Sequence, residues 1–195
     1  MGLDTDYIYS QTPLTEEELE GLLIKTISTR GELDEFEQHN IETAIDWSLR
    51  QNFSSAKILS ADFITGVHKR MFGRVWDWGG SFRDSNKNLG VDKYLIPQEL
   101  KLLFDNCEYW IENNTFPEDE IAIRFKHRLV QIHPFPNGNG RHSRFCADIL
   151  ISHVFNLPVF TWGQFSLTAP RELYLKVLRN ADAGDIKPLI DFARS

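Results

Sequence analysis

Apolar residues recur at helical spacing along most of this chain, and this periodicity limits the possible folds more than any other feature of the sequence. After Pro97, for example, Leu100, Leu103, Phe104 and Cys107 fall on one face of a helix. The same spacing predicts helices over about 15–25, 32–50, 60–71, 118–131, 141–154 and 170–179, and a last one from about residue 185. The 195 residues have the length of one ordinary domain. The sequence therefore predicts an all-α fold.

One long segment lacks helical spacing. Residues 76–83, Trp-Asp-Trp-Gly-Gly-Ser-Phe-Arg, combine aromatic side chains with two adjacent glycines, which interrupt a helix. Residues 84–95 then predict an irregular excursion with a short β-hairpin around 88–91, Asn-Leu-Gly-Val. Residues 1–13 have little apolar periodicity, so we expect a loose arm at that end of the sequence.

The formal net charge of −7 limits which partners the chain can bind. Broad nucleic-acid binding needs a basic face, so we expect no direct contact with nucleic acid. A small anionic ligand needs only a few local cations, and the net charge does not exclude it. The longest apolar runs contain only a few residues, too few for a transmembrane helix, so we expect no membrane contact. The first residues lack an apolar signal-peptide core, which predicts a cytoplasmic location.

A glycine-rich loop joins the helix predicted at 118–131 to the next one. Such a loop, opening onto a helix N-terminus, is an anion site, because its backbone N–H groups lack acceptors and the helix dipole favours negative charge. Gly138 and Gly140 have no Cβ, so the backbone there can approach phosphate oxygens and adopt positive φ. Asn139 can donate its side-chain amide to the same anion.

Charged and titratable residues flank this loop. Arg141 and Arg144 are three residues apart, so they share a helix face and can hold a polyphosphate. His133, just before the loop, could act as a general base near neutral pH. Each part has an ordinary alternative, since such loops are usually turns, arginines usually cover a solvated face and single histidines are usually structural. Their combination within the twelve residues 133–144 favours a functional site.

Residues 133–144, His-Pro-Phe-Pro-Asn-Gly-Asn-Gly-Arg-His-Ser-Arg, resemble the signature of Fic (Fido) domain proteins, except at Asn137, where the family usually has a carboxylate. Residues 67–83 resemble the Fic helix that ends in a Trp-Asp-Trp-Gly-Gly turn. The resemblance covers 58–193 and implies a Fic-type helical bundle with a short β-hairpin flap. Residues 1–57 would then form an N-terminal arm and helices. Asn137 and the acidic stretch at 32–50 most resemble the mobile mystery protein B group.

The resemblance implies a protein adenylyltransferase, which moves AMP from ATP to a Ser, Thr or Tyr hydroxyl of a target protein. His133 would take the proton from that hydroxyl. An extended target segment would pair with the flap at Leu89, Gly90 and Val91. ATP is the implied substrate, with Mg²⁺ or Mn²⁺ as the metal. The nucleotide-binding residues that the resemblance implies are Asn137, Gly138, Asn139, Gly140, Arg141 and Arg144.

Two features bear on the rate of that reaction. The family's carboxylate at position 137 binds Mg²⁺, whereas Asn137 offers an uncharged amide oxygen, so we expect a weak metal site and slower transfer. Many relatives are held inactive by a helix whose glutamate pairs with the second arginine of the motif, here Arg144. Glu32 and Glu37 are the candidate inhibitory residues in this chain. The alternative interpretation of both is an ordinary solvated helix face.

Three functions stay open at this point. The first is the adenylyltransferase, with a protein substrate. The second is a catalytically weak, nucleotide-binding regulatory module, which Asn137 favours. The third is transfer of another nucleotide or another phosphate-containing group, such as phosphocholine. Relatives on mobile elements also suggest an antitoxin-like or DNA-binding regulator as a partner.

Overall fold

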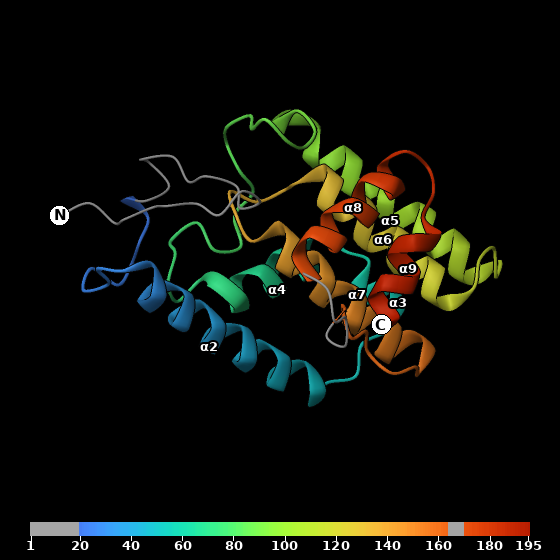
Figure 1. The fold of residues 1–195 in the computed structure, drawn as a ribbon, viewed down its shortest axis with the longest axis horizontal. Coiled ribbons are helices and arrows are strands. Elements are labelled where there is room, and N and C mark those ends of the chain that lie inside the picture. The colour runs from blue at the N-terminus through green and yellow to red at the C-terminus, as the bar shows by residue number, and fades with distance from the viewer. Residues whose placement is uncertain (1–19, 164–169) are drawn as a thin grey trace.

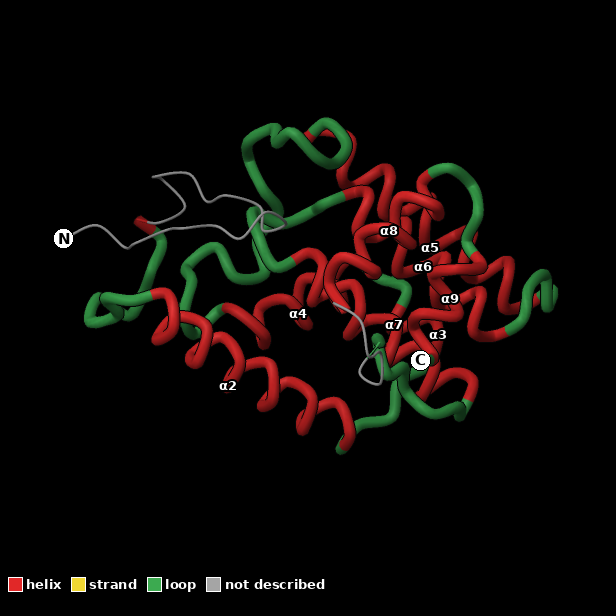
Figure 2. The backbone as a smooth tube through the Cα atoms, in the orientation of Figure 1, coloured by secondary structure: helices red, strands yellow, loops and turns green. Residues whose placement is uncertain are grey.

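The computed structural model describes residues 20–163 and 170–195, and helices make up nearly all of the regular structure in this part (Figure 1). The helices are α2 (Arg30–Leu49), α3 (Ser55–Ile58), α4 (Ala61–Phe72), η1 (Lys93–Leu95), α5 (Ile96–Glu112), α6 (Glu118–Ile132), α7 (Asn139–Phe155), α8 (Pro170–Asp182) and α9 (Lys187–Arg194). Figure 2 shows no strand among the described residues, and extended pairing there is limited to one bridge between Leu22 and Trp76. The predicted all-α class is confirmed. No described helix is both long enough and apolar enough to cross a bilayer.

Side-chain caps fix where several helices begin. The Thr29 hydroxyl accepts from the Glu32 N–H, and the Glu32 carboxylate accepts from the Thr29 N–H, which is a complete capping box for α2. The Ser60 hydroxyl accepts from the Phe63 N–H at the start of α4. Helix α5 has a proline in its first turn, where no intrahelical donor is needed. These starts follow local sequence rules.

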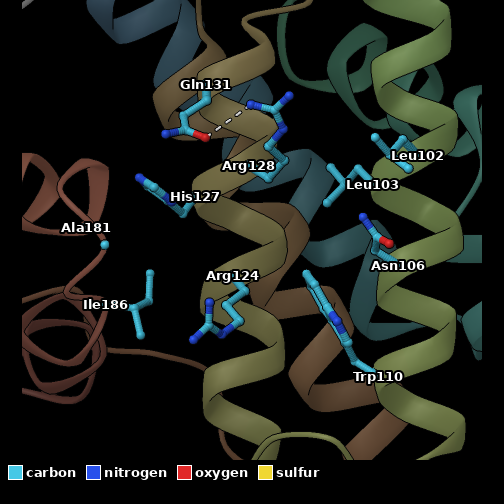
Figure 3. A pocket seen from close by; sticks show the side chains of 11 residues that line it. Leu102, Leu103, Asn106, Trp110, Arg124, His127, Arg128, Gln131, Ala181 and Ile186 are labelled. Carbon is cyan, nitrogen blue, oxygen red and sulfur yellow. Dashed lines mark hydrogen bonds between the residues drawn. The ribbon is translucent and has the colours of Figure 1, made fainter.

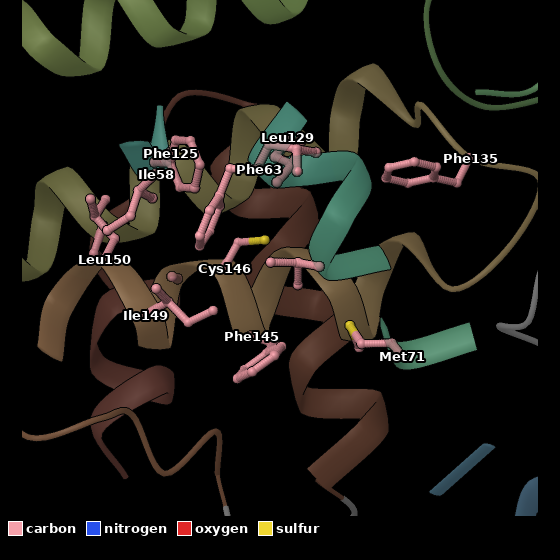
Figure 4. Packing of buried hydrophobic residues seen from close by; sticks show 14 of the residues in the cluster. Ile58, Phe63, Met71, Phe125, Leu129, Phe135, Phe145, Cys146, Ile149 and Leu150 are labelled. Carbon is pink, nitrogen blue, oxygen red and sulfur yellow. The ribbon is translucent and has the colours of Figure 1, made fainter. Parts of the chain in front are cut away.

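Helices α6 and α7 form the centre of the molecule. They share the largest contact of any two described helices, and α3, α4, α5 and α9 pack around them. Figure 4 shows the apolar side chains that fill this centre. The buried residues labelled there are Ile58, Phe63, Met71, Phe125, Leu129, Phe135, Phe145, Cys146, Ile149 and Leu150. Burial of these side chains supplies the main stabilisation of the fold, and it fixes the positions of the two ends of the loop between α6 and α7.

Helix α2 lies at one edge of the molecule, and its main contacts are with α4 (Figure 1). Its inner face is partly polar, because Glu37, Asn40 and Ser48 are buried together with Leu33 and Ala44. The outer face leaves Phe36 and Leu49 exposed. Because polar residues lie on the inner face and apolar residues on the outer face, the contact of α2 with α4 depends on polar interactions as well as on apolar burial.

Two local predictions differ from the structure. In the helix expected at 15–25, residues 15–19 lie outside the described residues, as does the arm at 1–13, and only Glu20 is helical in the remainder. From Gly21 onward the chain pairs with the aromatic segment instead: the Leu23 N–H donates to the Val75 carbonyl at 2.8 Å, and the Asp77 N–H to the Gly21 carbonyl at 2.9 Å. These backbone bonds to a distant segment replace the intrahelical ones.

The hairpin expected around residues 88–91 contains no strand. Its backbone groups do not pair across a turn. The Val91 N–H donates to the Ile132 carbonyl at 3.3 Å, and the Val91 carbonyl accepts from the Arg83 guanidinium. We call residues 84–92 the flap loop. Its shape is set by Arg83 and by the end of α6 rather than by hairpin pairing.

Candidate functional site

His133 ends α6 in the left-handed conformation, with φ 53° and ψ 58°, and so turns the chain into the motif loop, residues 133–140. Its side chain is buried, and its Nε2 atom has no hydrogen-bond partner in the described part of the chain. Burial, together with the nearby charges of Arg83 and Lys87, lowers the pKa of His133 to about 4. The imidazole is therefore neutral at pH 7, with an unused nitrogen.

Asn139 closes the motif loop. Its side-chain oxygen accepts from the Phe135 N–H at 3.0 Å, and its side-chain nitrogen donates to the Phe135 carbonyl at 2.8 Å. The loop's own backbone thus uses one of the two amide hydrogens, and donation of the other to an anion stays a prediction. Phe135 in turn stacks on His68, with ring centroids 3.7 Å apart. Asn139 thus acts as the clasp of the loop.

Gly138 provides the turn into α7. It adopts φ 75°, and a Cβ at this position would lie 2.6 Å from the Phe72 ring. No side chain caps α7, so the N–H groups of its first turn point out of the helix without acceptors from the helix itself. A Cβ at Gly140 would meet no atom within 4 Å, so the space beside this first turn is open. The helix end can therefore receive an anion.

His68 on α4 contacts the motif loop and helps to hold it in place. The Gly80 N–H donates to its Nδ1 at 3.0 Å, so Nδ1 must be an acceptor. The Nε2 atom, 3.0 Å from the Asn137 carbonyl, then carries the proton and donates to that oxygen. Complete burial lowers the pKa of His68 well below its usual value. A neutral imidazole with one fixed tautomer thereby joins the aromatic segment to the motif loop.

Arg83 connects the motif loop to the flap loop. Its side chain is 3% exposed, and its Nε donates to the His133 carbonyl at 2.7 Å. The rest of the guanidinium donates to the carbonyls of Ser85 and Val91. The Arg83 N–H also donates to the Pro134 carbonyl at 2.9 Å. One buried cation therefore fixes the backbone on both sides of the imidazole.

The flap loop lies directly on His133. A Cβ at Gly90, where φ is 96°, would be 2.7 Å from the His133 Cβ and 2.9 Å from an Arg83 nitrogen. Glycine is needed here both for the left-handed backbone and for this close approach. Leu89, the preceding residue, is 61% exposed. The flap loop covers the imidazole on its inner side and presents an apolar side chain on its outer side.

Arg141 and Arg144 extend in different directions from the start of α7. Arg141 lies over the Phe72 ring at 4.9 Å and donates to a Glu37 oxygen at 2.5 Å. The guanidinium of Arg144 lies 5.5 Å from the centre of the Tyr174 ring on α8. The two cations flank the helix end instead of stacking on one face.

Glu37 is the acidic residue that reaches the motif. It is 4% exposed, and its second carboxylate oxygen accepts from the Trp76 indole N–H at 2.6 Å. Glu32 is exposed at the start of α2, where its carboxylate accepts from the Ser28 and Thr29 N–H groups. The expectation of a pair with the second arginine is wrong in this structure. Helix α2 lies on α4 beside Phe72, and Arg141 is the arginine on that side.

Asn137 is the least well suited of the expected site residues to its expected role. Its side-chain oxygen accepts from the Gly138 N–H at 2.6 Å, which turns this oxygen toward the loop backbone. Magnesium prefers anionic oxygen ligands, and position 137 supplies a neutral amide. The described residues contain no group of three His, Cys, Asp or Glu side chains that could hold a metal. The protein ligand set for a divalent cation is therefore poor.

A separate cavity of about 220 Å³ lies between α5, α6 and the turn from α8 to α9 (Figure 3). Its basic side chains already have acidic partners. Arg128 donates to Glu99 at 2.6 Å, and His127 lies 2.8 Å from Asp182. Burial lowers the pKa of His127, so Asp182 accepts from a neutral ring at pH 7. No motif-loop residue lines this cavity, so we do not assign it to the candidate site.

Residues 58–151 match the model of the Fic/DOC family. The matched segment contains His68, Arg83, the flap loop and the motif loop, which are the parts that surround His133. These residues form a Fic domain.

Two relatives are each named Protein adenylyltransferase Fic. The chain is 29% identical to the protein from Aedes aegypti over 177 residues and 30% identical to that from Drosophila grimshawi over 175 residues. Each alignment covers 85% of this chain but only 34% and 35% of the relatives. The chain therefore spans about a third of the length of these curated relatives.

Solved structures share the fold. A Fic-1 fragment (aa134 - 508) from C. elegans has a TM-score of 0.64 at 24% identity, and the match covers 90% of this chain and 51% of that one. BepC from Bartonella tribocorum, solved with bound AMPPNP, has a TM-score of 0.67 at 19% identity and covers 92% and 97%. At these identities the likeness establishes the fold alone.

Sequence reasoning missed three residues that shape the site: His68, Trp76 and Arg83. All three lie in the segment 67–83, which resembles the family but carries no obvious catalytic pattern. In residues 76–83, three aromatic residues, two glycines and an arginine between predicted helices were the available signal. Their partners lie far away in sequence, so the segment by itself could not reveal what they hold.

Proposed function

We propose that this chain is a protein adenylyltransferase that transfers AMP from ATP to a Ser, Thr or Tyr hydroxyl of a target protein. One observation carries the proposal. The Nε2 atom of His133 is buried, without a partner among the described residues, in the loop that leads to the uncapped first turn of α7. A base and an anion-binding helix end thus occur in one loop. The shared name of the relatives from Aedes aegypti and Drosophila grimshawi agrees with this activity.

In the proposed reaction, the neutral imidazole of His133 accepts the proton of the target hydroxyl as its oxygen bonds to the α-phosphorus of ATP. The bond from that phosphorus to the bridging oxygen breaks, and pyrophosphate leaves. Negative charge on the phosphate oxygens is stabilised by the N–H groups of the first turn of α7, between Gly138 and Arg141. Arg141 and Arg144, on either side, would hold the β- and γ-phosphates.

We assign target docking to the flap loop. Gly90 keeps this loop within contact of His133, so a segment lying along its outer side would place a hydroxyl near the imidazole. Leu89 is 61% exposed and Tyr94, just beyond the loop, is 80% exposed. Exposed apolar side chains beside a site favour contact with another protein. Because the Val91 N–H and carbonyl are already used, docking would rely on the other backbone groups of the loop and on these side chains.

Residues 1–57 would regulate the domain at 58–193 through Glu37. The carboxylate holds Arg141 at 2.5 Å and turns its guanidinium toward α2, away from a triphosphate beside Gly140. The contact also anchors α2, because the Trp76 indole donates to the same carboxylate. Displacing α2 would release Arg141. Glu32 has no part in this proposal, since its carboxylate caps its own helix.

A second candidate function is a regulatory module that binds nucleotide but transfers it slowly. Asn137 favours it, because a Mg²⁺ or Mn²⁺ ion held there would depend on phosphate oxygens and water for most of its ligands. Transfer of another nucleotide or of another phosphate-containing group is a third alternative, which no contact among the described residues favours. The metal would neutralise charge on the phosphates when bound.

The same residues suggest a finer grouping. Asn137 and the acidic residues of α2 support placement in the mobile mystery protein B group, with a cytoplasmic location. Members of such a group would act beside an antitoxin-like or DNA-binding regulator. Co-purification of this chain with the product of an adjacent gene would test that partnership.

The activity is tested by incubating the full chain and its Glu37→Gln variant with α-labelled ATP, Mn²⁺ and a cell lysate. We expect label on proteins, and a loss of roughly 10³-fold in His133→Ala, because a general base contributes about 10²- to 10⁴-fold. His133→Ala should still bind ATP, which controls for folding. Labelling that survives His133→Ala would refute the proposed base. Tight ATP binding without any labelling would instead support the regulatory module.

A further inference from the structure

A groove with a volume of about 440 Å³ lies between α2 and α4. Helix α2 contributes Asn40, Thr43 and Trp47 to its lining. A Cβ at Gly66 on α4 would meet nothing within 4 Å, which is one reason why the groove is hollow. No residue of the motif loop lines it.

The basic residues that line the groove all lie on its α4 side. Lys69, Arg70 and Arg74 all come from α4 and the residues that follow it, and no described lining residue is acidic. Arg70 lies over the Trp47 ring at 4.0 Å. Neither Lys69 nor Arg74 forms an ion pair with any described residue. This concentration of unpaired cations is unusual in a chain whose formal net charge is −7.

Asn40 is the second, independent sign of a ligand. It is 4% exposed, it lines the groove, and its side chain has no hydrogen bond to any described residue. Its amide atoms are not among the fully buried polar atoms that lack a partner, so water or a ligand in the groove can reach them. Thr43, one turn further on, donates its hydroxyl to the His39 carbonyl and keeps its oxygen lone pairs for another donor. Polar groups on α2 thus face cations on α4.

The ordinary interpretation of these cations is that they complement the dipole at the C-terminal end of α4. That accounts for Lys69 and Arg70 in the last turn. It does not account for Arg74 beyond the helix, for the hollow beside Gly66, or for the unpartnered amide of Asn40 on the opposite wall. A ligand that accepts hydrogen bonds and carries negative charge accounts for all of them.

We propose that this groove is a second anion site, which binds a small phosphorylated molecule carrying more than one negative charge. Such a ligand contacts both α2 and α4, so it binds only while α2 is docked, and by linkage it stabilises the docked state. Asn40 lies on the same face of α2 as Glu37, three residues away. Occupancy therefore strengthens the Glu37–Arg141 contact, and this consequence, unlike the binding itself, rests on the proposed function.

Binding is tested with inorganic tripolyphosphate as the probe, by calorimetry on the full chain in about 0.15 M salt. An Arg144→Ala background weakens uptake at the motif loop. The Lys69→Ala/Arg74→Ala pair should weaken the remaining binding by roughly tenfold or more, because it removes two charge-assisted contacts. Lys101→Ala/Lys187→Ala is the matched control, since both lysines are exposed and lie elsewhere. This control should leave the affinity unchanged.

Hydrogen exchange of α2 measures the linkage without any transfer reaction. At tripolyphosphate tenfold above its dissociation constant, opening of α2 should slow about tenfold in the Arg144→Ala background, and not in the Lys69→Ala/Arg74→Ala variant of it. The proposed site is refuted if the Arg144→Ala protein does not bind tripolyphosphate, or if the Lys101→Ala/Lys187→Ala control loses as much affinity as the Lys69→Ala/Arg74→Ala pair. Binding without slower exchange overturns its link to α2. Both outcomes are independent of whether the protein transfers AMP.

Discussion

Helix α2 reaches the start of α7, directly after the motif loop, through the Glu37–Arg141 ion pair, yet the loop and α2 are held in different ways. The loop is fixed from within the Fic domain by Asn139, His68 and Arg83, all buried and all hydrogen-bonded to its backbone. Helix α2 buries polar residues against α4, including Asn40 without a partner among the described residues. Polar burial stabilises an interface less than apolar burial does, because the loss of hydration offsets much of what the hydrogen bonds contribute. The comparison teaches that the loop keeps its shape through buried partners inside the domain, whereas the docking of α2 depends on the polar contacts of Glu37.

Gly138→Ala should give the largest loss of stability of the variants considered, and it tests whether the motif loop is as rigidly held as the contacts indicate. Alanine would have to adopt φ 75°, and its Cβ would lie 2.6 Å from Phe72. Left-handed strain and overpacking together should lower the free energy of unfolding by roughly 3 kcal/mol. Gly140→Ala is the matched control, because its Cβ meets no atom within 4 Å. Urea denaturation that ranks the two variants equally would contradict the described loop geometry.

The pH dependence of stability tests the buried imidazole. The pKa of His133 is about 4 in the folded chain and about 6.5 when unfolded, so the unfolded state binds the proton first as pH falls. Stability contributed by the neutral ring is full above pH 6.5 and is lost as pH falls toward 4. Between pH 7 and 5 the free energy of unfolding should drop by about 2 kcal/mol more in the parent than in His133→Asn.

Comparison with His133→Asn isolates this effect. Burial raises the pKa of Asp148 to about 7, so its protonation stabilises the folded chain as pH falls and acts in the opposite direction. That contribution is the same in both proteins and cancels in the difference. Identical pH profiles for parent and variant would mean that the imidazole is solvated, and that the flap loop does not cover it.

Glu37→Gln tests how strongly α2 is held at the site. The amide can still accept from the Trp76 indole, but it loses the charge that holds Arg141. We expect transfer to rise roughly tenfold, which corresponds to a loss of about 1.4 kcal/mol from the contact that docks α2. Initial rates with labelled ATP measure the change. An unchanged or reduced rate would show that the contact does not restrain the site.

Glu32→Gln is the companion variant, with the smallest expected effect. It weakens the capping box of α2 and should cost about 1 kcal/mol or less in stability. Transfer should stay within about twofold of the parent, because Glu32 bonds only to the start of its own helix and does not contact Arg141. A stimulation equal to that of Glu37→Gln would mean that any loosening of α2 is sufficient, and that the Glu37 charge has no special role.

Much of the site could be predicted from local sequence. The glycines, the histidine and the start of a helix lie within twelve residues, and their backbone conformations follow from short-range sterics. Gly138 does adopt positive φ and α7 does begin uncapped, as such a pattern predicts. The loop-closing role of Asn139 could not be predicted, because an anion and the Phe135 backbone are equally good partners for an amide. Only the folded loop decides between them.

The sequence by itself determined the all-α class, the main helices and the composition of the motif loop, because these depend on contacts within a few residues. Tertiary structure decided which glutamate reaches the motif and which arginine it meets. Glu37 and Arg141 are 104 residues apart, and their contact depends on how α2 lies against α4. It also decided that the flap is an irregular loop and not a hairpin, because the Arg83 guanidinium donates to the Val91 carbonyl, which a hairpin would have paired across its turn. Contacts at such separations leave no local pattern, since each depends on the packing of every helix between.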